Sequence, residues 1–475
     1  MKLIYGVNDK PKFGQLIVFA IQQLLAIMTA TLVVPVIIGN GMSPAAALFG
    51  AGIGTLVYIA FTKKKSPVFL GSSFAFINSM FAAFAGGVSM SLGYLGLLIG
   101  AAFAGLVYVV IAIIVKVAGV KWINKVMPAT VIGPVVAIIG LSLAGNAVGD
   151  MGKGNITKEV VETVAIINEA GAAELVNQTT AVQLASPIAT VFVGLVTLII
   201  VAVCASYGKK MVKMIPFIFG ILGGYAVAAI MTAIGFAANI DALKILNVQP
   251  FVNLLPEGKI ALETFISVPN FTFLTAFKGV GELNATYIST IAVAYIPVAF
   301  VVFAEHLADH KNISSIIETD LLEEPGLHRT LLGDGVGSIA GALFGGCPNT
   351  TYGESVGCVA ITKNASVYTI ITAAVLAMLI AFVSPFIAFV NSIPSCVMGG
   401  VCMALYGFIA VSGLKMIQGV DLNQNKNLFV VSSILIAGIG GLTLTFGKVT
   451  LTSVACALII GIIVNVIVSK AKEDE

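Results

Sequence analysis

The stretch CPNTTYG, residues 347–353, interrupts a chain that is otherwise strongly apolar, and LGSSF at residues 70–74 is a second such interruption. Each lies at the start of a short apolar run, 350–365 and 69–84 respectively. The polar, glycine-containing start of these runs is unlike the interior of a helix. Backbone that leaves the helical conformation inside a bilayer has N–H and C=O groups in need of partners. A planar polar ligand can supply them, so the two stretches predict a binding site; a kink or re-entrant loop without a ligand is the alternative.

The composition places the chain in lipid. Of its 475 residues, 58% are hydrophobic and only 10% are charged, whereas soluble domains carry about 25% charged residues. No soluble core could bury so much apolar surface, so the sequence predicts an integral membrane protein with the lipid bilayer as its partner. Arg329 is the only arginine, and no stretch combines clustered cations with aromatic residues, so nucleic-acid binding has no support.

Apolar runs long enough to cross a bilayer recur along the whole chain. Roughly 20 helical residues, at about 1.5 Å each, cross a hydrocarbon core of about 30 Å. We therefore expect an all-α polytopic membrane protein with fourteen transmembrane segments. The runs, numbered in chain order as spans 1 to 14, are 14–38, 44–61, 69–84, 92–115, 126–148, 186–206, 214–239, 285–307, 330–346, 350–365, 367–391, 394–414, 427–446 and 450–469.

The basic residues test this layout. With a cytoplasmic N-terminus, the outer loops hold six of the 25 basic residues, and the other 19 (25 − 6) lie in cytoplasmic segments and tails. An excess of Lys and Arg on the cytoplasmic side is the orientation rule for membrane proteins. The split predicts a multi-pass protein of the cytoplasmic membrane with both termini in the cytoplasm. The long outer loop 149–185 has room for a short amphipathic helix.

Two pairs of segments indicate an internal repeat. Residues 51–56, AGIGTL, resemble residues 334–339, DGVGSI, and residues 127–133, MPATVIG, resemble residues 393–399, IPSCVMG. Both pairs map span n onto span n + 7, and because seven is odd the two halves enter the membrane in opposite orientations. Inverted repeats and interrupted segments at matching positions, here spans 3 and 10, are typical of secondary transporters.

Two acidic residues within the apolar runs stand out as functional candidates. Glu305 closes a long apolar segment, and Glu354 follows the interrupted stretch at 347–353. A charge at the bilayer centre costs at least about 2.5–3.5 kcal/mol, so such residues are functional candidates. For Glu305 the alternative is a place at the cytoplasmic end of its span, in solvent beside His306 and His310.

Nothing in the sequence indicates an enzyme, a cofactor or a metal centre. The chain has no G-x-S-x-G, no H-E-x-x-H and no phosphate-binding loop. Its three histidines, at 306, 310 and 328, fall in one stretch that the layout places toward the cytoplasm, so we expect them to be exposed in a loop.

Several motifs resemble one known family, the nucleobase–cation symporters, also called nucleobase–ascorbate transporters. The most specific is NTTYGE at 349–354, followed by Gly357 and AITK at 360–363. Three others are similar to the bacterial uracil permease branch of the family. These are LGSSFAF at 70–76, AEH at 304–306 and PGLHR at 325–329, and the resemblance as a whole covers about residues 14–470.

The resemblance implies an architecture. Family members have two inverted repeats of seven spans, and spans 3 and 10 begin as short strands that meet at the bilayer midplane. Spans 1–4 and 8–11, here 14–120 and 285–391, form a core domain. Spans 5–7 and 12–14, here 121–240 and 394–470, form a gate domain, through which the family also implies a possible homodimer.

The same resemblance implies the site and its cargo. Glu305 and Glu354 would accept hydrogen bonds from the N–H-bearing edge of uracil, and backbone groups at Phe74 and Gly353 would meet its carbonyls. The side chains implied to line the pocket are those of Ala30, Ser73, Tyr352 and Tyr406. The expected activity is secondary active import of uracil by alternating access. A purine carrier for xanthine or urate with the same fold, and an anion exchanger of similar architecture, are the alternatives.

Two departures from the family pattern bear on the coupling ion. Asp309 stands where uracil permeases often have His, and Ser355 stands where the family often has Asn. In the family these positions belong to the hydrogen-bond network of the proton-carrying glutamate, here Glu305. Proton symport is the favoured mechanism, and sodium coupling is the alternative.

Overall fold

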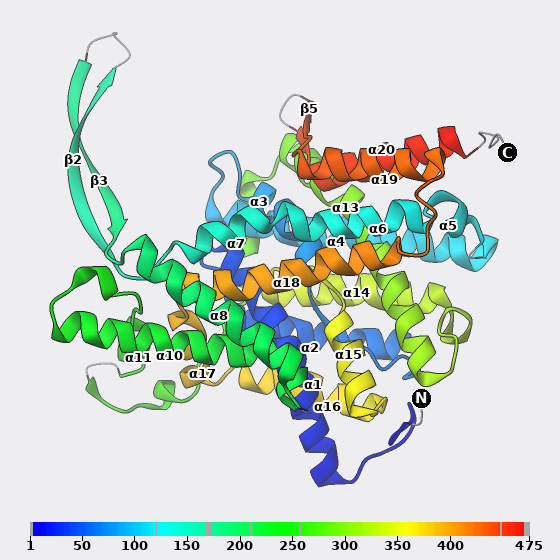
Figure 1. Cartoon of the computed structure of the whole chain (residues 1–475), viewed down its shortest axis with the longest axis horizontal. Helices are drawn as coiled ribbons and strands as arrows, with labels where there is room; N and C mark the ends of the chain where they lie inside the picture. Colours follow the sequence, from blue (N-terminus) through cyan, green and yellow to red (C-terminus); the bar gives the residue numbers. More distant parts are fainter. Residues whose placement is uncertain are drawn as a thin grey trace. The chain divides into compact units, whose positions relative to one another are not determined.

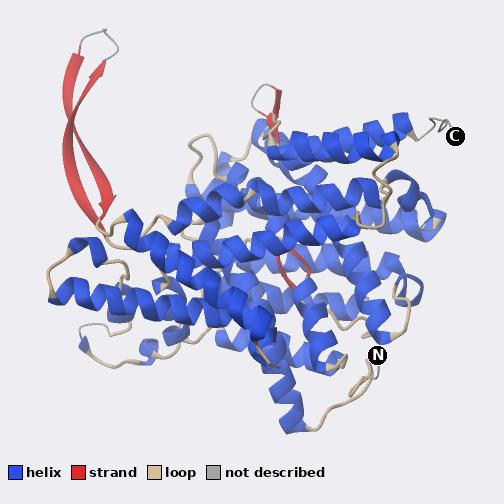
Figure 2. Ribbon diagram, in the orientation of Figure 1, coloured by secondary structure: helices blue, strands red, loops and turns tan. Residues whose placement is uncertain are grey.

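A computed structural model describes residues 3–119, 121–167, 173–209, 211–255, 258–446 and 449–469. Helices dominate these residues (Figures 1 and 2). In chain order the α-helices are α1 (Phe13–Ile38), α2 (Pro44–Phe61), α3 (Ile77–Ala83), α4 (Met90–Ala118), α5 (Lys121–Val126), α6 (Ala129–Ser142), α7 (Ala144–Met151), α8 (Pro187–Tyr207), α9 (Met211–Met214), α10 (Pro216–Ala237), α11 (Gln249–Val252), α12 (Thr272–Ala276), α13 (Ala285–Ile317), α14 (Leu327–Gly345), α15 (Gly353–Thr362), α16 (Val367–Ile380), α17 (Ser384–Ser392), α18 (Ser395–Met416), α19 (Asn425–Ile439) and α20 (Ser453–Val468). The strands are β1 (Leu70–Ser72), β2 (Thr157–Ile167), β3 (Ala173–Gln183), β4 (Asn349–Thr351), β5 (Leu444–Phe446) and β6 (Val449–Leu451).

The long apolar helices confirm a helical, polytopic membrane protein. Among the described residues, eight helices are long and apolar enough to cross a bilayer. They are Phe13–Ile38, Pro44–Phe61, Met90–Ala118, Ala129–Met151 (α6 and α7 counted together), Pro187–Tyr207, Pro216–Ala237, Ala285–Ile317 and Ser395–Met416. Polar residues fix where several of them begin: the side chains of Ser43, Ser89 and Asn284 each accept a hydrogen bond from a backbone N–H in the first turn of α2, α4 and α13.

The two interrupted stretches form paired strands, as predicted. β1 and β4 run antiparallel, with Leu70 opposite Thr351 and Ser72 opposite Asn349, and every residue of both strands is buried. Figure 2 shows this short pair among the helices. The pairing satisfies the backbone groups that the break in the helix exposes, which is the requirement that the sequence imposed.

Glycines bring α2 and α14 into backbone contact beside the strands. A Cβ on Gly50 would lie 2.3 Å from the carbonyl oxygen of Gly341, and a Cβ on Gly54 would lie 2.8 Å from that of Gly337. The side-chain amide of Asn349, the first residue of β4, donates to the carbonyl of Gly50 at 3.2 Å. The crossing therefore fixes β4 against α2 and requires the absence of side chains at these positions.

Three sequence-based expectations are wrong. Beyond the end of α7 at Met151, the loop 149–185 contains no described helix; most of its described part is the hairpin β2–β3, and 168–172 lie outside the described residues. A second hairpin, β5–β6, joins α19 to α20, so the described chain is not all-α. Finally, α13 continues to Ile317 rather than ending near 307, because residues beyond that point, such as Ile313, are still buried.

The chain forms two compact units, which are described separately. One comprises Met1–Ala144, Leu262–Ile387 and Leu405–Glu475, and the other comprises Gly145–Ala261 and Ala388–Ala404. Every site residue named from the sequence lies in the first unit. These units cut across the expected core and gate segments, whose division stays a prediction.

Candidate functional site

The junction between β4 and α15 forms the centre of the candidate site. The backbone N–H of Tyr352 donates to the carbonyl of Phe69 at 3.2 Å, and its hydroxyl donates to the carbonyl of Ser72 at 2.7 Å. On the opposite strand the N–H of Ser73 donates to the carbonyl of Pro348 at 2.9 Å. These bonds hold the two strand ends together. They also hold the buried Tyr352 side chain against the first strand, and its expected place in the pocket lining stays a prediction.

Glu354 lies in the first turn of α15, and Glu305 lies on α13, which contacts both β4 and α15. Both residues are partly exposed and Gly353 is exposed, although Tyr352 and Ser355 beside them are buried. Among the residues that the structure describes, no Lys, Arg or His forms an ion pair with either glutamate. The two acids therefore face accessible space as uncompensated hydrogen-bond acceptors.

Asp309 is a third acid on the same face of α13, one turn after Glu305. Its carboxylate accepts a hydrogen bond from the hydroxyl of Thr351 at 3.0 Å. A Cβ on Gly353 would lie 3.5 Å from its Oδ1 atom. Asp309 therefore joins α13 to the end of β4, and its expected part in proton coupling stays a prediction.

The remaining residues expected in the pocket are buried on elements that meet here. The rings of Phe74 and Tyr406 make an edge-to-face contact, with centroids 5.9 Å apart. Ser73 is buried at the end of β1, and Ala30 is buried on α1, which contacts β1, α3 and α15. Their expected contacts with a ligand stay predictions.

Ser355 has partners that the sequence did not reveal. Its hydroxyl oxygen accepts hydrogen bonds from the side-chain amide of Gln23 at 2.5 Å and from the backbone N–H of Phe69 at 2.9 Å. Gln23 and Ser355 are both buried. Ser355 thus connects α1, the segment leading into β1, and α15. The expected part of Ser355 in proton coupling stays a prediction. The sequence signal for its partner was a polar residue, Gln23, inside the apolar run 14–38.

Ser355→Ala is expected to destabilise the protein and to lower its transport rate. The change leaves two buried N–H donors without an acceptor, and each unsatisfied group costs about 1–3 kcal/mol. Thermal unfolding and initial uptake rates of the purified, reconstituted protein measure both effects. The matched control is Ser289→Ala, because among the described residues that exposed hydroxyl bonds only to the carbonyl of Thr286 in its own helix. Equal unfolding temperatures for the two variants would contradict the assignment.

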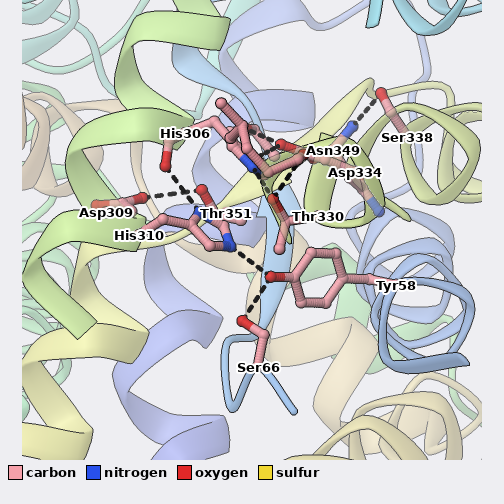
Figure 3. A network of polar contacts seen from close by, with 12 residues as sticks. Tyr58, Ser66, His306, Asp309, His310, Thr330, Asp334, Ser338, Asn349 and Thr351 are labelled. Carbon is pink, nitrogen blue, oxygen red and sulfur yellow. Dashed lines mark hydrogen bonds and ion pairs between the residues drawn. The ribbon is translucent and has the colours of Figure 1, made fainter. Parts of the chain in front are cut away.

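Behind the site lies a buried polar network that sequence reasoning missed (Figure 3). His306 and His310 are fully buried, so the expectation of exposed histidines is wrong for both. Asp334, inside the apolar run 330–346, is also fully buried, and its Oδ2 atom lies 2.6 Å from Nδ1 of His306. An acid inside an apolar run was the available signal, as it was for Glu305.

Comparisons with known proteins agree with a membrane transporter fold. The model of the permease family, Xan_ur_permease, matches residues 14–180 and 165–447. The chain belongs to this family. It is a permease and not an enzyme.

Two relatives show how far the similarity extends. The uracil permease of Bacillus subtilis (strain 168) is 36% identical over 478 aligned positions, which cover 100% of this chain and 97% of that protein. The uracil permease of Escherichia coli (strain K12) is 33% identical, with 96% of this chain and 92% of that protein covered. The similarity is thus that of whole proteins and not of a shared segment.

Solved structures define the fold. The transmembrane domain of a cyanobacterial bicarbonate transporter, BicA, superposes with a TM-score of 0.57 at 13% identity, covering 97% of this chain and 100% of that chain. The murine anion transporter Slc26a9 in its inward-facing state gives 0.61 at 12% identity, covering 97% and 69%. The chain shares the fold of these transporters, and at such identities the likeness is one of fold alone.

Proposed function

We propose that this chain imports uracil across the cytoplasmic membrane by proton symport with alternating access. The observation that carries the proposal is the placement of Glu305 and Glu354, without a partner cation among the described residues, beside the paired strands of a chain related over its full length to uracil permeases. Uracil presents ring N–H donors flanked by carbonyl acceptors. Carboxylates suit the donors, and backbone N–H groups at the exposed start of α15 suit a carbonyl.

Fourteen spans in two inverted repeats of seven are part of this proposal, and helix contacts support them. The alignment of the halves pairs Gly52 with Gly335. A Cβ on Gly52 would lie 2.7 Å from the carbonyl of Ala374 in span 11, and one on Gly335 would lie 3.0 Å from the carbonyl of Gly105 in span 4. Spans 4 and 11 are themselves equivalent, so aligned glycines make equivalent contacts.

The second aligned pair behaves in the same way. A Cβ on Gly133, near the start of span 5, would lie 2.9 Å from the carbonyl of Gly413 at the end of span 12. A Cβ on Gly399, near the start of span 12, would lie 2.8 Å from the carbonyl of Ala147 at the end of span 5. Reciprocal contacts of this kind are what two segments related by a two-fold axis make, and such an axis relates inverted repeats.

The proposal includes a working cycle. The core, 14–120 and 285–391, carries uracil and moves against the gate, 121–240 and 394–470, with both termini in the cytoplasm and a homodimer formed through the gate. Glu305 carries the coupling proton, and Asp309 and Ser355 belong to its surroundings. Sodium in place of the proton is the alternative for the coupling ion, since Asp309 and Ser355 replace the residues that the family often has there.

Uptake of [¹⁴C]uracil tests the cargo and the ion together. Cells that lack their own uracil permease and express this chain are expected to accumulate uracil above background, and a protonophore is expected to reduce accumulation to background. Uptake that is insensitive to the protonophore but depends on external sodium would show that sodium, and not the proton, is the coupling ion. Uptake of labelled xanthine or urate, with uracil neither taken up nor competing, would replace uracil as the cargo. Chloride or sulfate currents without uracil uptake would refute the proposal.

A further inference from the structure

α13 presents two different polar faces. Glu305 and Asp309, one turn apart, lie on the face toward β4 and α15, where Asp309 bonds to Thr351. His306 and His310 are also one turn apart, and because successive helical residues are about 100° apart they lie on the adjoining face. Their rings stack on each other with centroids 4.0 Å apart. The acids thus face the candidate site and the histidines face the packed interior.

The hydrogen bonds of His306 determine where its protons are. The hydroxyl of Thr330 donates to the carbonyl of Leu327 at 3.1 Å, so toward His306 it acts as an acceptor from Nε2–H at 3.0 Å. Nδ1 of His306 and Oδ2 of Asp334, 2.6 Å apart, therefore hold one further proton between them. Whichever atom carries it, the pair has no net charge, which is the inexpensive state for two fully buried groups.

Asp334 also reaches back toward the site. The hydroxyl of Thr350, in the middle of β4, donates to its Oδ2 atom at 3.5 Å. The pair therefore connects α13, α14 and β4 (Figure 3). α13 carries Glu305, and β4 leads directly into Glu354.

A second set of bonds fixes the same face of α13. Nδ1–H of His310 donates to the carbonyl of His306 at 2.8 Å, which leaves Nε2 to accept from the hydroxyl of Tyr58 at 2.6 Å. Because Tyr58 has used its proton, the hydroxyl of Ser66 donates to it, also at 2.6 Å. All of these side chains are buried. The histidine face of α13 is thus held at two successive turns, against α14 and against α2.

We propose that His306 and Asp334 form a positioning pair, which fixes the rotation of α13 relative to β4 and so sets the separation of Glu305 and Glu354 for the ligand. The pair does not contact the ligand; it acts through Glu305. This inference rests on the proposed function, because a misplaced Glu305 is expected to change the affinity for uracil. Misplacement of a binding group by about 1 Å can cost 10²-fold where geometry is exacting.

Uracil binding to the purified full-length protein in lipid nanodiscs tests the pair. His306→Gln and Asp334→Asn are expected to raise the Kd at least tenfold. His306→Asn, whose amide lies nearer the Nδ1 position and keeps a donor toward Asp334, is expected to raise it less. In a Glu305→Gln background the same changes are expected to alter the Kd less than threefold, because the group through which they act is already changed.

Tyr287→Phe is the matched control. It removes buried hydrogen bonds to the carbonyls of Ala83 and Leu92 from the opposite end of the same helix. It is expected to lower the unfolding temperature and to leave the Kd within twofold in both backgrounds. Equal effects of His306→Gln with and without Glu305 would assign the pair to general stability and overturn the inference, as would loss of folded protein in all three pair variants.

A geometric measurement covers the case in which Glu305→Gln binds too weakly to measure. With cysteines in place of Glu305 and Glu354, bifunctional thiol reagents of increasing length report the separation of the two positions without any ligand. His306→Gln is expected to change which length cross-links best, and an unchanged profile would overturn the inference. A wild-type protein that binds no uracil while the cross-linking profile shifts as expected would instead refute the proposed function and leave the positioning geometry supported.

Discussion

Replacing Glu354 by Ala is expected to abolish uracil transport while the protein still inserts and folds. Hydrogen bonds to charged groups contribute about 1.5–3 kcal/mol each, so the loss of one such bond weakens binding by about tenfold or more. The fold does not depend on this carboxylate, because among the described residues no cation forms an ion pair with it. Removing this carboxyl group therefore leaves no unpaired cation behind among the described residues.

The measurement compares uptake with the amount of protein in the membrane. Membrane abundance and unfolding temperature of Glu354→Ala are expected to match the wild type, with uptake at background. Glu263→Ala is the matched control, because Glu263 is an exposed acid in the same compact unit and far from the strand pair in sequence. If the Glu354→Ala variant takes up uracil at more than half of the wild-type rate, the assignment of Glu354 to the binding site is refuted.

The parts of this site that local sequence determines could be predicted. Polar, glycine-containing stretches inside apolar runs cannot continue as helix in lipid without partners for their backbone groups, so the sequence located the two interruptions. That they form the paired strands β1 and β4 was implied by the family resemblance. Glu354 stood out for the same reason, as an acid without neighbouring charges. The glycine alignment also has a local origin, because close helix packing selects small residues at regular spacing.

The parts that depend on long-range packing could not be predicted. Asp334 and His306 are 28 residues apart, and nothing local shows that α13 continues beyond its apolar run to place them 2.6 Å apart. The histidine-rich segment therefore resembled a solvated helix end. Gln23 and Ser355, 332 residues apart, are a second example. The hairpin β2–β3 is different, because the many Val and Thr residues of 157–183 already favoured strands over a helix.

Gly50→Ala is expected to destabilise the fold strongly, although it adds only one methyl group. The added Cβ would lie 2.3 Å from the carbonyl oxygen of Gly341 and 3.2 Å from the backbone nitrogen of Gly345. Both atoms are backbone, so no side chain can move aside, and α2 must separate from α14. Overpacking typically costs about 1–3 kcal/mol, and this contact belongs to the upper end of that range or beyond it.

Separation of α2 from α14 is also expected to displace β4 and so to alter the candidate site. Asn349 donates its side-chain amide to the carbonyl of Gly50 and its backbone N–H to the hydroxyl of Ser338 on α14, at 3.0 Å, so β4 is tied to both helices. We expect a lower unfolding temperature together with weaker uracil binding. Gly407→Ala is the matched control. It adds the same methyl group to an exposed position in the middle of α18 with no atom within 4 Å, and Ala is the better helix former by about 1 kcal/mol.

The two glycine variants separate backbone contact from helix propensity. If Gly50 is needed only for flexibility, both substitutions should stabilise their helices and leave uptake unchanged. If it is needed because the backbones of α2 and α14 touch, only Gly50→Ala should lower the unfolding temperature, and Gly341→Ala, on the other side of the contact, should lower it to a similar extent. Its Cβ would lie 2.0 Å from the amide nitrogen of Asn349. The strand that carries the site would then be displaced from either side of the same crossing.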